Sequence, residues 1–124
     1  DWDKILHLTG EKQSYILNFA SGDVILRQGQ QHCMLAQIVK GSCSITPKHC
    51  SSPTAWLGSG EILGDVEFLA NCSSVSTITA SEPTVIAVLH RSFIEDELTS
   101  SDPLLAAKFY RYLAQALGIR FRNY

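Results

Sequence analysis

The sequence has no arginine between Arg27 and Arg91, and its only lysines in that interval are Lys40 and Lys48. Over the whole chain, 10 Lys and Arg stand against 12 Asp and Glu, a net charge of −2. This balance gives no electrostatic attraction for nucleic acid or for an anionic membrane surface. No apolar run approaches the ~20 residues that span a bilayer, and no signal-peptide pattern stands at the N-terminus. We therefore expect neither a nucleic-acid-binding protein nor a membrane span.

Motifs for metal binding and catalysis are also missing. The histidines, serines and carboxylates form no recognisable triad or paired-acid motif, so we expect no enzyme. His32-Cys33 and His49-Cys50 repeat a pair of residue types that can bind zinc, but both pairs flank turns, where polar residues are expected anyway. A cupin-like metal-binding barrel is a third alternative, although it needs closely spaced histidines such as H-x-H, which are absent. Without a C-x-x-C pair, we expect reduced thiols in a cytoplasmic protein for all four cysteines, Cys33, Cys43, Cys50 and Cys72.

The first two thirds of the chain carry short β-like runs. Turn signals recur roughly every 8–12 residues, which favours an antiparallel sandwich or barrel. The predicted strands are 15–19, 24–26, 34–39, 43–46, 55–57, 75–79 and 84–89. The length of 124 residues suits a single domain, and because the chain does not begin with Met we expect it to be part of a larger protein.

The ends of the chain are predicted to be helical. Residues 1–12 form an entry helix, 91–98 a short helix, and 104–122 a long helix capped by Ser101 or Asp102. One face of the long helix carries Leu105, Phe109, Tyr112 and Leu113. Its apolar arc continues over Tyr110, Leu117 and Phe121. This arc is wider than a helix needs in order to pack against one neighbouring surface. We expect these three side chains to be markedly exposed, or to contact a neighbouring domain of the parent chain or another protein.

The most informative segment is 60–77, GEILGDVEFLANCSSVST, called the cassette below. It resembles the phosphate-binding cassette of the cyclic-nucleotide-binding domain family. Earlier segments fit the same family in order and spacing: GDVI at 22–25, QG at 28–29 and IVKGS at 38–42. The resemblance implies a mainly β fold, an antiparallel β-roll with an N-terminal helix and C-terminal helices. It divides a single domain, 1–124, into an entry helix 1–12, a β-roll 13–90 and C-terminal helices 91–124.

In that family an acidic residue holds the ribose 2′-hydroxyl and an arginine holds the cyclic phosphate. The resemblance places Asp65 at the acidic position and Ser74 at the arginine position. We expect position 74 at an opening of the barrel, where an arginine could reach solvent. The candidate ligand-binding residues are Gly64, Asp65, Val66, Glu67, Ser73, Ser74, Ser76 and Thr77.

Without the arginine, the cassette should have lost its affinity for cAMP and cGMP. We therefore expect a non-catalytic regulatory or interaction module of a larger cytoplasmic signalling protein, with no cofactor and no metal. A functional cAMP or cGMP receptor with an atypical cassette is the alternative. The serines and Thr77 also leave open a different ligand, neutral or amide-bearing.

Overall fold

The computed structural model describes residues 14–31, 34–70, 73–90, 95–96 and 99–122. The predicted entry helix 1–12 and most of the predicted helix 91–98 lie outside the described residues, as do His32, Cys33 and Cys72.

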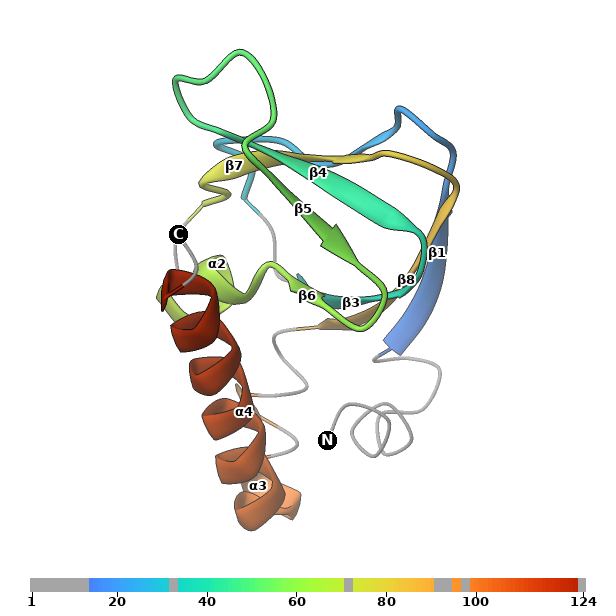
Figure 1. Ribbon diagram of the computed structural model, residues 1–124. Helices are drawn as coiled ribbons and strands as arrows, with labels where there is room; N and C mark the ends of the chain where they lie inside the picture. The colour runs from blue at the N-terminus through green and yellow to red at the C-terminus, as the bar shows by residue number, and fades with distance from the viewer. Residues whose placement is uncertain (1–13, 32–33, 71–72, 91–94, 97–98, 123–124) are drawn as a thin grey trace.

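Two four-stranded antiparallel sheets form the body of the domain (Figure 1). One sheet has the order β1-β8-β3-β6 and the other β2-β7-β4-β5. The predicted β-roll is confirmed, and every predicted strand is present within one residue at each end. The strands are β1 (Ser14–Phe19), β2 (Val24–Leu26), β3 (Met34–Lys40), β4 (Ser42–Pro47), β5 (Ala55–Gly58), β6 (Ile62–Leu63), β7 (Ser76–Ala80) and β8 (Thr84–His90).

One strand, β6, was not predicted. Its two residues pair with Ala36 and Gln37 of β3, which fixes the start of the cassette against the first sheet. A strand of two residues is too short to show the alternation by which a strand is recognised in sequence.

The turn between β3 and β4 depends on a glycine. Gly41 has a φ of 106°, and a Cβ placed there would lie 2.6 Å from Thr84 Oγ1 and 2.7 Å from the Pro83 carbonyl oxygen. Neither the backbone conformation nor the space admits a side chain. The glycine therefore lets the hairpin pass against the start of β8.

The first sheet separates two apolar cores. Successive side chains of a strand point to opposite faces, so Leu35 and Leu89 face one core while Ala36 and Val88 face the other. The barrel core lies between the two sheets and includes Ile38, Ile86 and Ile78. The second core, which we call the helical core, lies between the first sheet and the helices and consists of Leu35, Ile62, Phe68, Leu89, Leu105, Ala106, Phe109 and Leu113.

The described part of the chain has three helices, α2 (Asp65–Ala70), α3 (Thr99–Ser101) and α4 (Pro103–Arg122). Asp102 Oδ1 accepts the Leu105 amide at 3.1 Å and so caps α4, as predicted. The buried face of α4 is centred on Leu105, Phe109 and Leu113, whereas Tyr112 is exposed. Placing Tyr112 on the buried face was therefore wrong. Among the described residues, no helix combines the length and hydropathy needed to cross a bilayer.

Candidate ligand-binding site

The cassette begins with a tight turn into a short helix. Gly64 is buried and has a φ of 82°, and its carbonyl oxygen accepts the Phe68 amide at 2.9 Å. This turn ends β6 and starts α2, which lies at one side of the barrel, beside the C-terminal end of α4 (Figure 1). Phe68 fills the helical core, so α2 is held in place from one side.

Glu67 turns its carboxylate into the cassette. The side chain is only 4% exposed, and Oε1 accepts the Val75 backbone amide at 3.2 Å. The Ser74 hydroxyl lies 3.4 Å from the same oxygen. Hydrogen bonds to a carboxylate are stronger than those between neutral groups. Helix α2 and the segment that precedes β7 are thus joined through one buried acidic side chain.

Ser74 is itself buried, with 2% of its surface exposed. Its amide donates to the Gln30 carbonyl oxygen at 2.9 Å, and its own carbonyl accepts the Gly29 amide at 2.7 Å. The hydroxyl also reaches the Ser76 carbonyl oxygen at 3.0 Å. The expectation that position 74 opens to solvent was wrong, because these backbone bonds turn the side chain inward toward Glu67.

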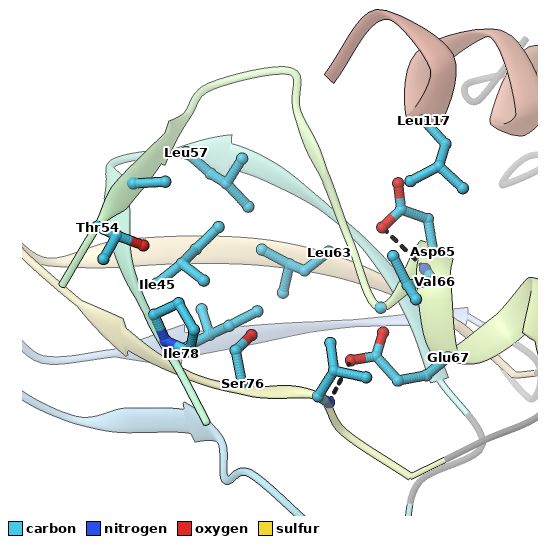
Figure 2. A pocket seen from close by; sticks show the side chains of 14 residues that line it. Ile45, Thr54, Leu57, Leu63, Asp65, Val66, Glu67, Ser76, Ile78 and Leu117 are labelled. Atoms are coloured by element: carbon cyan, nitrogen blue, oxygen red, sulfur yellow. Dashed lines mark hydrogen bonds between the residues drawn. The ribbon is translucent and has the colours of Figure 1, made fainter. Parts of the chain in front are cut away.

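A pocket of about 480 Å³ lies between the cassette and the second sheet (Figure 2). Five of the predicted site residues line it, Gly64, Asp65, Val66, Glu67 and Ser76. Three others, Ser73, Ser74 and Thr77, lie outside its lining. Thr77 instead accepts the Gln28 amide at 3.1 Å through Oγ1.

Most of the pocket wall is apolar and was missed by sequence reasoning. Its main apolar residues are Ile45, Leu57, Leu63, Val75, Ile78 and Leu117. The alternation of apolar residues along β4 and β7 was the signal for the barrel members, since it predicts which side chains point inward. Which inward residues border a cavity, rather than pack completely, could not be read from that alternation.

The carboxylate of Asp65, predicted to meet a ribose, accepts the Val66 amide at 3.0 Å through Oδ1. The residue is 2% exposed, and Figure 2 shows its side chain directed toward Leu117 of α4. The end of α4 therefore contributes to the same pocket as the start of α2.

The predicted contact residues of α4 are less exposed than expected. Tyr110 is half-buried, with its ring centroid 6.0 Å from that of Phe68 and 6.1 Å from that of Phe109. Leu117 is half-buried beside the pocket. The marked exposure predicted for both was wrong, because the wide apolar arc packs on α2 as well as on the sheet. The side chain of Phe121 lies outside the described residues.

Within the described part of the chain, no group of three or more His, Cys, Asp or Glu is placed to hold a metal ion. His49 and Cys50 are exposed in the β4–β5 loop, and Cys50 and Cys43 are free thiols. Cys43 is fully buried in the barrel core, and this burial raises the pKa of its thiol to about 11, against a weaker opposing hydrogen bond from Thr84. Neither thiol lines the pocket.

Known proteins are similar to this chain in sequence and in fold. The chain is 25% identical over 126 residues to cyclic GMP-binding protein C of Dictyostelium discoideum, a match that spans 99% of this chain but 4% of that protein. A cyclic nucleotide-binding domain from Methylobacillus flagellatus superposes with a TM-score of 0.84 at 24% identity, covering 90% of this chain and 64% of that one.

A third similar structure is the regulatory subunit of a cAMP-independent protein kinase A from Trypanosoma brucei, with a TM-score of 0.63 and 26% identity over 85% of this chain and 41% of that one. It is a triple mutant bound to cAMP in its A site. A glutamate is changed to alanine, a threonine seven positions later to arginine, and the valine after it to alanine. The family model for the cyclic nucleotide-binding domain matches residues 16–101, and the chain belongs to that family.

Proposed function

We propose that this domain is a non-catalytic regulatory module of a larger cytoplasmic signalling protein, and that it does not bind cAMP or cGMP at micromolar concentrations. The observation that carries the proposal is the buried Glu67 carboxylate, which holds the Val75 amide beside Ser74, the position of the family's arginine. A buried acid in this place repels a second anion.

The repulsion between the Glu67 carboxylate and a phosphate is a large share of the binding free energy of a micromolar ligand. Two like unit charges ~4 Å apart oppose each other by about 4 kcal/mol at an effective dielectric near 20. A dissociation constant of ~10 μM corresponds to roughly 7 kcal/mol of binding free energy. A phosphate that lacks its arginine and faces Glu67 loses a large share of that energy.

The trypanosome mutant supports the same reading. Its three substituted residues are a glutamate, a threonine and a valine at relative positions 0, 7 and 8. This chain has Glu67, Ser74 and Val75 in that order and spacing, with one hydroxyl residue in place of another. The replaced trio of a protein described as cAMP-independent is thus nearly the native trio here.

Helix α4 is the element through which we expect a neighbouring domain or another protein to act. Tyr110 contacts Phe68 of α2, and Leu117 borders the pocket, so both lie between α4 and the cassette. The opposite side of α4 carries exposed Leu104. Movement of α4 would therefore shift the cassette, and a change in the cassette would shift α4. The free thiols Cys43 and Cys50 fit the reducing cytoplasm that we propose.

A functional cyclic-nucleotide receptor is the second candidate. It is favoured by the match to a protein named cyclic GMP-binding protein C over 99% of this chain. Isothermal titration of the purified domain with cAMP and with cGMP separates the two candidates. We expect no saturation below about 10 μM, and a tighter constant for either nucleotide would establish the receptor and refute the proposal.

A further inference from the structure

The pocket beside the cassette is large enough for a small organic molecule. Its volume of about 480 Å³ lies within the ~300–1,000 Å³ typical of small-molecule sites. Such sites combine apolar walls with a few polar groups that fix orientation. Here the apolar wall comes from Ile45, Leu57 and Ile78 of the second sheet and from Leu117 of α4.

The polar side chains in the described lining of the pocket are acidic or neutral. Asp65 and Glu67 supply carboxylates, and Thr54 and Ser76 supply hydroxyls, whereas no lysine, arginine or histidine is found among the described residues that line it (Figure 2). The Val75 amide, a donor at the edge of the cassette, is already bonded to Glu67. An anionic ligand would meet like charge here without a cation to offset it.

Hydroxyl groups, in contrast, are suited to this lining. A carboxylate presents about four lone-pair positions on two oxygens, so it can accept ligand hydroxyls in addition to backbone donors. Asp65 and Glu67 both lie on α2, and Figure 2 shows their carboxylates on the side of α2 that borders the pocket. A flat apolar body would meet the barrel wall while its hydroxyls meet these acids.

We propose that the pocket takes an uncharged ligand of nucleoside size, with a flat, largely apolar body and hydroxyl donors but no phosphate. This rests on the proposed function, because it requires Glu67 to occupy the anion's place in the cassette. The Glu67 side chain then acts as a specificity-determining residue that selects on ligand charge.

The test uses pairs of probes that differ in the phosphate. The unmodified domain is titrated with adenosine and guanosine, and separately with cAMP and cGMP, by calorimetry and by amide shifts of the Val75 and Ser76 backbone. We expect at least one nucleoside to saturate, with a dissociation constant at least 100-fold below that of its cyclic nucleotide, and to shift both amides.

Charge selection has its own readout. Glu67→Gln keeps the side-chain shape and removes one negative charge, so the preference for the nucleoside over its cyclic nucleotide should fall at least tenfold. Glu82→Gln is the matched control. Glu82 is exposed on the β7–β8 turn, bonds Ser42 and lies outside the pocket, so this variant should keep the preference unchanged.

The outcomes separate the two proposals. If neither nucleoside saturates at 1 mM and the cyclic nucleotides do not bind, this inference is overturned while the proposed function stands. If a cyclic nucleotide binds the unmodified domain more tightly than its nucleoside, the inference is overturned, and the proposed function is overturned as well when that dissociation constant is below about 10 μM. If a nucleoside binds but Glu67→Gln folds and keeps the same preference, Glu67 does not select on charge and the inference fails.

Discussion

Replacing Glu67, Ser74 and Val75 together should convert the cassette into a cyclic-nucleotide site. Glu67→Ala removes the carboxylate and releases the Val75 amide from its 3.2 Å hydrogen bond. Ser74→Arg adds a guanidinium that can hold a phosphate with two parallel hydrogen bonds. Val75→Ala removes a branched side chain that borders the pocket. The triple variant should therefore present donors and a cation to the phosphate.

The expected gain follows from the charges. Loss of the Glu67 carboxylate and gain of a guanidinium at position 74 each change the interaction with a phosphate ~4 Å away by about 4 kcal/mol at an effective dielectric near 20. Desolvation of the arginine and loss of its rotamer freedom offset roughly half of the sum. The remaining ~4 kcal/mol corresponds to about a thousandfold in dissociation constant for cAMP.

The single variant Ser74→Arg provides the matched comparison. The Ser74 hydroxyl is 3.4 Å from the Glu67 carboxylate, so an arginine at this position would pair with Glu67 rather than with a ligand. It should gain less than tenfold, measured by calorimetry with cAMP and cGMP on samples shown to be folded by circular dichroism. A folded triple variant without any gain, or a single variant with the full gain, would refute the role given to Glu67.

Two further predictions concern the fold. Gly41→Ala should lower the free energy of unfolding by about 2 kcal/mol or more, because the new Cβ would clash with Thr84 and because residue 41 has a positive φ. Gly58 has open space around it, so Gly58→Ala should change the denaturation midpoint far less. Stability should also fall as the pH rises from 9.0 to about 11, by roughly 2 kcal/mol, since only the unfolded chain ionises Cys43 there. Urea unfolding across this pH range should show a smaller loss in Cys43→Val, and an equal loss in both proteins would show that other groups control it.

The strands and the long helix were predictable because each carries a repeating pattern. The alternation along β7 and the helical spacing of Leu105, Phe109 and Leu113 each extend over enough residues to identify the element and its buried face. The strand β6 is two residues long and carries no such pattern. It exists because β3 offers a partner, which is a tertiary cause.

The site was predicted only in part, because its side-chain directions also depend on tertiary contacts. The order of glycines and acids pointed to Asp65 and to the substitution at Ser74, but not to the direction of the side chains. That Glu67 turns inward to bond Val75 depends on the fold of the whole cassette. In the same way, the half-buried Tyr110 reflects an aromatic neighbour, Phe68, that lies far away in sequence.

Where α2 and α4 cover it, the first sheet is buried on both faces, and this bears on how the domain can be shortened. A fragment that stops before α4 would keep all eight strands, yet it would expose Leu35, Ile62 and Leu89 to water across one side of the sheet. Contiguous apolar surface of that kind promotes aggregation. The β-roll is therefore not an independent unit of expression, and any soluble fragment of this domain must carry α4 at least as far as Leu113.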